Sequence, residues 1–133
     1  MVSSRLFAGL LLASSSAAVA GLYDQPWSAV EPADASTVRK EFPASITQID
    51  GRSTSNPKRS EAVAPGKHVV TIRFETARVN QSEAEATREL DLNLEPCTRY
   101  RIAARRTTGT KWEPQVYTEP ISECARKFQK PAS

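Results

Sequence analysis

The chain has 133 residues, 39% of them hydrophobic, and its 18 lysines and arginines against 15 aspartates and glutamates give a net charge of +3. A chain of this length supports one folded domain and excludes a second domain of ordinary size. Residues 97–133 hold 8 basic against 3 acidic side chains. This excess is well short of a polybasic arm, so nucleic acid is not an expected partner.

Residues 1–20 have the pattern of a secretory signal peptide. Arg5 supplies the positive start, Leu6 to Ala13 form the apolar run, and Ala18-Val19-Ala20 is an A-x-A cleavage site. Serines end the apolar run before it reaches the roughly 20 residues of a membrane-spanning helix. We predict cleavage between Ala20 and Gly21, a periplasmic or secreted location, and no stable membrane anchor.

Residues 21–133 are expected to form a single domain, with residues 126–133 as a flexible tail. The two cysteines, Cys97 and Cys124, both lie in the exported part. In an oxidising compartment an isolated pair usually forms one disulfide, which is the prediction here; two free thiols are the alternative.

Short segments with strand patterns follow one another between prolines and turn residues. Residues 27–43 are expected to add an edge strand, and residues 45–53 form a strand that ends at the turn signal Asp50-Gly51. Residues 68–76 form the clearest strand. Its inward positions alternate with polar ones and are His68, Val70, Ile72 and Phe74.

The second half of the chain continues the pattern. Strands are predicted over residues 88–96, 98–106 and 111–117, and the polar stretches 52–62 and 79–89 are predicted loops. Several short strands with turn signals at modest spacing predict an all-β fold. We therefore expect a single small antiparallel β-sandwich or open barrel with one disulfide.

The last two strands should form a hairpin. Tyr100, Ile102 and Ala104 share one face, which must meet the apolar face of the following strand. A three-residue loop, 107–109, satisfies this requirement and pairs Ala104 with Trp112. Because Pro114 cannot donate a ladder hydrogen bond, the last strand is expected at a sheet edge.

The opposite face of this hairpin is basic. It carries the candidate anion-binding residues Arg99, Arg101, Arg105 and Lys111. The simpler interpretation is a solvated strand face with Glu113 as one internal counter-charge. Both interpretations stay open at this point.

No catalytic or metal site is expected. His68 is the only histidine, and its place at the start of a strand after a tight turn predicts hydrogen bonding to nearby backbone. One histidine with two oxidised cysteines cannot supply the ligands of a metal site. No glycine-rich phosphate loop is present, so we expect neither an enzyme nor a cofactor.

Two segments, ITQIDGRS and VAPGKHVVTIRF, suggest a family. Over residues 46–76 the chain resembles the PEGA-type β modules of bacterial envelope proteins, in which a strand ends in a D-G turn and a P-G-x-H turn opens the next strand. The chain departs from that pattern by lacking a literal P-E-G-A and by its long 52–62 loop. The resemblance implies a small exported β-sandwich without catalytic residues.

Three functions are compatible with these features. The first is a monomeric, non-catalytic module that binds or supports an envelope protein or polymer. The second is a secreted inhibitor of a hydrolase that inserts the 52–62 or 79–89 loop into an active site. The third is a polyanion-binding protein that uses the basic hairpin face.

Overall fold

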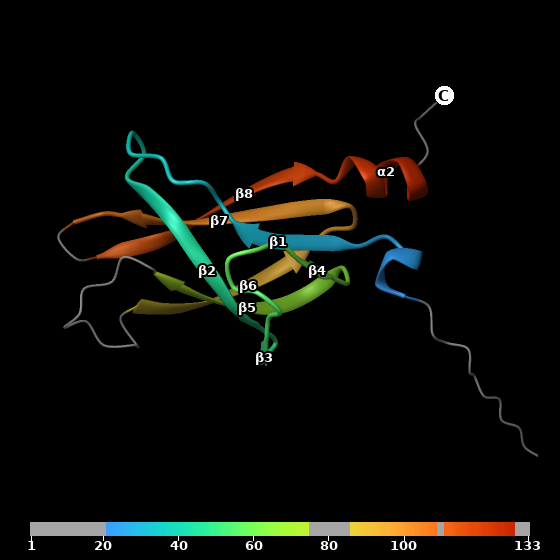
Figure 1. Ribbon diagram of the computed structural model, residues 1–133, viewed down its shortest axis with the longest axis horizontal. Coiled ribbons are helices and arrows are strands. Elements are labelled where there is room, and N and C mark those ends of the chain that lie inside the picture. Colours follow the sequence, from blue (N-terminus) through green and yellow to red (C-terminus); the bar gives the residue numbers. More distant parts are fainter. Residues whose placement is uncertain (1–20, 75–85, 109–110, 130–133) are drawn as a thin grey trace, which may run out of the picture.

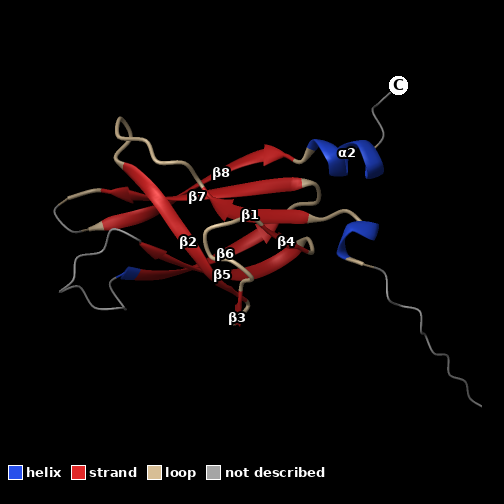
Figure 2. Ribbon diagram, viewed as in Figure 1, coloured by secondary structure: helices blue, strands red, loops and turns tan. Residues whose placement is uncertain are grey.

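The computed structural model describes residues 21–74, 86–108 and 111–129, and most of them lie in strands (Figures 1 and 2). The predicted all-β fold is confirmed. The elements are η2 (Leu22–Asp24), β1 (Ser28–Pro32), β2 (Glu41–Ile49), β3 (Arg52–Ser53), β4 (Glu61–Val63), β5 (Gly66–Phe74), β6 (Thr87–Leu94), β7 (Thr98–Arg106), β8 (Trp112–Pro120) and α2 (Ser122–Phe128).

One strand joins the two layers of the sheet. The strand order is β4-β1-β7-β2-β5-β6, with β8 added to β7 and β3 to β2. The first residues of β2, Glu41 to Pro43, pair with β7, and the later ones pair with β5. β2 therefore passes diagonally from one layer to the other in Figure 1, and the sheet is open rather than closed.

A β-bulge in β2 explains an irregularity in the sequence pattern. Ile46 and Ile49 cannot share a face in a regular strand, because they are three positions apart. The register with β5 shifts between Ile46 and Gln48, so that Ile46 pairs with Ile72 and Ile49 pairs with Val70. The extra residue returns Ile49 to the side of the core, against which it packs.

The core lies between the two layers. Its buried members are Val30, Ala44, Ile46, Val63, Val70, Ile72, Phe74, Leu94, Tyr100, Ile102, Ala104 and Trp112. Phe74 and Trp112 are in contact across the layers, with ring centroids 4.8 Å apart. The period-2 patterns of β5 and β7 thus identified the buried faces correctly.

The prediction of an edge strand within residues 27–43 is wrong. β1 lies between two strands: it pairs antiparallel with β4 and parallel with β7, with Ala29 beside Arg99. The sheet is therefore mixed rather than purely antiparallel. Parallel pairing between segments about 70 positions apart leaves no signature in a local pattern, which is why the sequence did not show it.

The predicted hairpin is correct in its faces and wrong in its loop. Trp112 pairs with Arg106, two positions from the expected Ala104, so residues 107–111 connect β7 and β8. A shift of two preserves the alternation of faces. Thr107 N–H donates to Lys111 O at 3.0 Å and Lys111 N–H to Thr108 O at 2.8 Å, which ties the base of the longer loop. β8 is an edge strand as predicted, since among the described strands it pairs only with β7.

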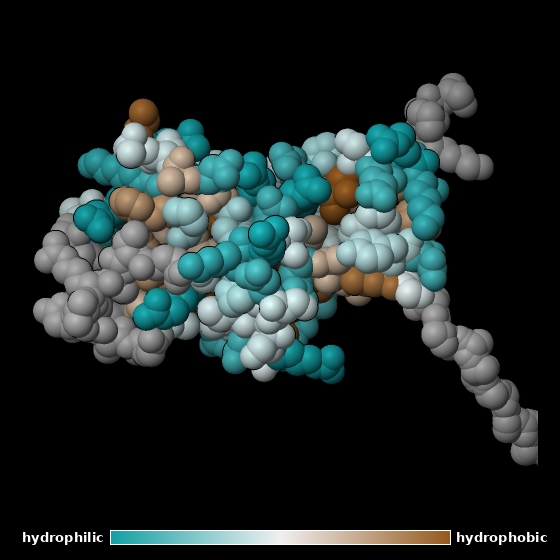
Figure 3. All heavy atoms as spheres, viewed as in Figure 1, coloured by the Kyte–Doolittle hydropathy of each residue, from teal (hydrophilic) through white to brown (hydrophobic). Residues whose placement is uncertain are grey.

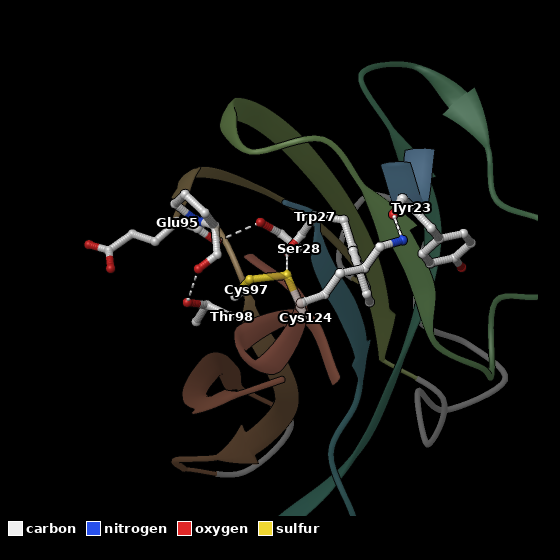
Figure 4. The surroundings of a disulfide bond; sticks show 9 residues. Tyr23, Trp27, Ser28, Glu95, Cys97, Thr98 and Cys124 are labelled. Carbon is white, nitrogen blue, oxygen red and sulfur yellow. Dashed lines mark hydrogen bonds between the residues drawn. A yellow bond between two sulfur atoms is a disulfide. The ribbon is translucent and has the colours of Figure 1, made fainter. Parts of the chain in front are cut away.

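The predicted disulfide is confirmed. Cys97 and Cys124 are joined, with Cα atoms 5.2 Å apart, because the chain turns after Pro120 into α2 (Figure 4). Residues 126–128 belong to this helix, so the tail predicted for 126–133 begins too early. Phe128 packs against Trp27, with the two ring centroids 6.2 Å apart. The local sequence could not indicate this partner.

The remaining predictions concern loops and the first residues. Stretch 52–62 is not wholly a loop, because β3 begins it and β4 starts at Glu61. Of stretch 79–89, residues 79–85 lie outside the described residues, and β6 starts at Thr87. The predicted signal peptide, residues 1–20, also lies outside them. None of the described helices is long and apolar enough to cross a membrane.

Candidate functional site

The basic face of the hairpin carries its own counter-charges. Arg99 Nε lies 3.0 Å from Glu31 Oε1, and Arg99 Nη1 lies 3.1 Å from Glu119 Oε1. Arg101 is held between Glu31, at 3.4 Å from its Nε, and Asp34, at 3.2 Å from its Nη2. Glu31 can reach both arginines because β1 pairs parallel with β7 and places Glu31 beside Arg101.

The third arginine of this face is also paired. Arg105 Nη1 lies 3.8 Å from Glu113 Oε1 and donates to Gln115 Oε1 at 3.2 Å. Lys111, the fourth candidate, is exposed at the hairpin loop. The structure therefore brings Arg99, Arg101 and Arg105 together with carboxylates, which occupy the groups that a polyanion would contact.

His68 is bonded to the backbone, as predicted, and also to a carboxylate. Its Nε2 lies 2.7 Å from Ala64 O, and its Nδ1 lies 2.5 Å from Asp50 Oδ2. Asp50 Oδ1 accepts the Val69 N–H at 2.8 Å. This bond, and then the bond with His68, lower the pKa of the Asp50 carboxyl below its usual value. With both ring nitrogens engaged, His68 is poorly placed to take a proton from a nucleophile.

A tight turn explains why Asp50 points at His68. Asp50 and Gly51 both have positive φ, 53° and 81°, as a hairpin turn between β2 and β3 requires. The carboxylate then faces β5, where it fixes the turn to the strand start. We interpret the Asp50–His68 pair as a support for this turn, and the sequence signal for it was the D-G dipeptide.

The feature that sequence analysis missed is the turn at residues 36–41. Ser36 and Glu41 exchange backbone hydrogen bonds of 2.9 and 3.0 Å, and Lys40 adopts a positive φ of 56°. At its tip Val38 is 91% exposed. In Figure 3 hydrophobic atoms stand out from the hydrophilic surface over this connection between β1 and β2, at the upper left. An apolar residue amid polar turn formers, DASTVRKE, was the available signal.

A buried carboxylate braces this turn. Glu41 is only 1% exposed, accepts a hydrogen bond from the Tyr117 hydroxyl on β8, and lies 3.0 Å from Arg39 Nε. Burial acts to raise the pKa of Glu41, but the hydrogen bonds from Tyr117 and Arg39 outweigh it and lower that pKa. The same bond to Glu41, with burial, raises the pKa of Tyr117. Arg39 also lies 5.8 Å from the centre of the Tyr117 ring.

A depression of about 500 Å³ adjoins the turn, lined by Thr37, Lys40, Phe42, Arg106 and Thr107. The Arg106 guanidinium lies 5.4 Å from the centre of the Phe42 ring, and the Arg106 N–H donates to Lys40 O at 2.9 Å. Within the described part of the chain, neither Lys40 nor Arg106 has a carboxylate at ion-pair distance. Among the described residues, a basic side chain of β7 thus meets an apolar surface here without a carboxylate at ion-pair distance.

Residues 21–74, 86–108 and 111–129 contain no group of three or more metal-ligating side chains. In comparisons with known proteins, no family model, no curated protein and no solved structure matches the chain. The resemblance to PEGA-type modules therefore stays a prediction.

Proposed function

We propose that this protein is an exported, non-catalytic β-sandwich module that binds a component of the bacterial envelope, and that turn 36–41 is its contact element. The observation that carries the proposal is the exposure of Val38, 91%, on a turn whose base is fixed by buried Glu41. An apolar side chain held in water at a protruding tip gains free energy when a partner covers it.

The contacts of Glu41 matter for binding, because a turn that had to become ordered on contact with a partner would bind more weakly. Arg39 and Tyr117 hold Glu41 from two sides, and the Ser36–Glu41 bonds close the turn. A turn that is already fixed loses little conformational entropy on contact with a partner. Support by side chains from β2 and β8 thus favours a presented binding element over a passive connection.

Site-specific photo-crosslinking in the cell envelope tests the proposal. A photoreactive amino acid at position 38 is expected to give a discrete crosslinked product, whereas one at Arg126, which is exposed on α2, should give none. Equal crosslinking at both positions, or none at either, would contradict the assignment of the turn.

Inhibition of a hydrolase remains the second proposal, and one observation favours it. The exposed 54–60 loop is tied to β2, because Thr54 Oγ1 donates to Ile46 O at 2.6 Å and Ile46 N–H donates to Pro57 O at 2.8 Å. A loop fixed in this way could enter an active site with little ordering. Addition of the protein to envelope hydrolase assays should then lower activity, and a change in loop 54–60 should restore it.

The polyanion proposal has less support. Its residues Arg99, Arg101 and Arg105 are each within 4 Å of a carboxylate, so only Lys111 of the original set is left for an incoming anion. Binding there would require breaking ion pairs already formed. Retention on heparin resin, if it occurs, is expected to end at low salt concentration.

A further inference from the structure

We infer that the depression beside turn 36–41 binds a carboxylate carried on an apolar segment of a partner protein, with Lys40 and Arg106 contacting the carboxylate and Phe42 and Val38 contacting the apolar part. The inference rests on the proposed function, because it assigns the chemistry of the partner of the same turn. Four steps support it.

The first step is the difference among the arginines of β7. Arg99, Arg101 and Arg105 alternate along the outer face, and each has an acidic partner. Arg106 points to the other side, where among the described residues it has none. Within the described ranges, the basic side chains of β7 that face carboxylates from the 31–34 segment and β8 are paired, and the one at the depression is not.

The second step is the presence of two basic residues at one depression. The backbone bond from Arg106 N–H to Lys40 O, 2.9 Å, joins their main chains, and both residues line the depression. An anion in the depression would be attracted by both side chains. The guanidinium is suited to a carboxylate because its planar donors match the two oxygens.

The third step is the apolar surface beside the cations. Phe42 is half-buried, packs on the core, and has the Arg106 guanidinium 5.4 Å from its ring centre. This cation–π contact orients the guanidinium and leaves its outer edge for a ligand. The cations and the aromatic ring thus lie on one surface, where a ligand with a carboxylate and an apolar part could contact both.

The fourth step separates a protein segment from an anionic polymer. A polymer with regularly spaced charges needs a row of free cations, and the row on β7 is already paired. The depression instead offers two cations and one aromatic surface in about 500 Å³, a volume suited to one or two side chains. Charge complementarity therefore favours an acidic residue next to apolar ones.

Two peptide probes can test the site on the purified protein by NMR titration. One is acetyl-Leu-Glu-Leu-amide, whose carboxylate is a side chain, and the other is acetyl-Leu-Leu with a free carboxyl end. The expected result is that one or both shift the amide signals of Lys40, Arg106 and Thr107, and that salt weakens the effect. The probe that binds identifies the source of the carboxylate. Acetyl-Leu-Gln-Leu-amide should not bind.

Variants set the size of the effect. Arg106→Gln should weaken the peptide affinity by about tenfold or more, because a charge-assisted bidentate contact is lost. Arg101→Gln, a matched change on the other face of β7, should leave the affinity unchanged. Both proteins should be checked for an unchanged fold by their NMR spectra. Signals that shift only around Arg99 and Arg101, or a heparin fragment that binds at Arg106 when no peptide does, would overturn the inference.

The two proposals fail in different ways. If crosslinking from position 38 persists in the Lys40→Gln/Arg106→Gln double variant, the turn remains the contact element and the carboxylate inference is wrong. If peptides bind at Arg106 but position 38 gives no crosslink in the envelope, the site exists and the proposed function of the turn is wrong.

Discussion

The two ends of the sheet are stabilised by different kinds of contact. At one end, which we call the clasp end, η2 and α2 meet around Trp27 and the Cys97–Cys124 disulfide (Figures 1 and 4). At the other, the turn end, turn 36–41 is held by hydrogen bonds to buried Glu41. The clasp end buries Trp27, whereas the turn end exposes Val38 and has Lys40 and Arg106, which pair with no carboxylate among the described residues.

This difference assigns stability to the clasp end and, under the proposed function, binding to the turn end. Trp27 O accepts the Cys97 N–H at 2.6 Å, and the Trp27 ring is in edge-to-face contact with Tyr23 at 4.9 Å and Phe128 at 6.2 Å. Such contacts tie the first and last described segments together independently of the other end. Exposed apolar and charged groups lower the stability of a small domain. The domain tolerates this loss more easily when a disulfide stabilises its opposite end.

The largest expected effect is at the clasp end. Trp27→Ala should lower the free energy of unfolding by about 3–5 kcal/mol, because it leaves a cavity among Tyr23, Phe128 and the disulfide. Urea unfolding followed by circular dichroism measures it. Trp27→Phe is the control and should lose much less; if both variants unfold alike, the ring contacts are not the source of stability.

The disulfide should come next in size. Cys97→Ser opens a bridge between positions 27 residues apart, and loop-entropy models value such a closure at about 3–3.5 kcal/mol. Thermal unfolding should occur at a markedly lower temperature. The Cys97→Ser/Cys124→Ser double variant should behave similarly, since the single variant leaves only a buried thiol. Unchanged melting in both would show that the bridge does not constrain the unfolded chain.

Polar contacts at the turn end should matter less. Glu41→Gln should cost about 1–2 kcal/mol at neutral pH, since it weakens charge-assisted bonds whose Arg39 partner is 56% exposed. The folded-state pKa of Glu41 is lowered, so its contribution is present above about pH 4.3 and is lost as pH falls through the folded pKa. The free energy of unfolding should therefore fall less on acidification in the Glu41→Gln variant than in the original protein.

Two further variants separate the contributions to this pH profile. Asp50 also has a lowered pKa, so Asp50→Asn should remove a second part of the acid-side loss. Tyr117 has a raised pKa, so its contribution is present below about pH 10 and is lost as pH rises through the folded value. Tyr117→Phe should flatten the alkaline side, and it should also reduce the acid-side loss, because it removes a hydrogen bond that lowers the pKa of Glu41. An acid profile unchanged by Glu41→Gln would mean that this carboxylate is not preferentially ionised in the folded state.

Local patterns predicted the strands but not their long-range partners. The alternation in β5 and β7 gave the buried faces directly. Successive side chains of a strand point to opposite faces, so the apolar set must be the buried one. The cysteine pair followed from the predicted compartment. β1 was misplaced because its partner Arg99 is 70 positions from Ala29, and α2 was missed because Phe128 packs on Trp27 from 101 positions away.

The candidate site shows the same limit. The four basic residues proposed as an anion site were chosen by their spacing on one strand, but Glu31 and Asp34, which neutralise Arg99 and Arg101, come from a segment 67 or more positions earlier. Glu41 and Tyr117 are 76 positions apart. Sequence spacing could reveal which side chains share a face. It could not reveal which charges on that face are already paired.

The paired arginines offer a smaller test of the comparison. Arg99→Gln removes two ion pairs from a partly exposed position and should change stability by about 0–1 kcal/mol, with the difference shrinking as salt is added. Lys67→Gln, an exposed basic position on β5, is the control and should be near zero. A loss of several kcal/mol in the Arg99 variant would mean that this face stabilises the fold as strongly as the clasp end does.

The smallest stability effect should occur where the functional effect is largest. Val38→Asp replaces a side chain that is 91% exposed, so it should leave the free energy of unfolding within about 0.5 kcal/mol of the original. The same change puts a negative charge on the apolar tip next to the cations, where an incoming carboxylate would meet repulsion and lose its apolar contact. Binding of the acidic peptide should therefore weaken while melting is unchanged, and Val38→Ile should preserve both. If Val38→Asp melted several degrees lower, Val38 would have to be buried against part of its own chain, and the division between a clasp end that stabilises and a turn end that binds would not hold.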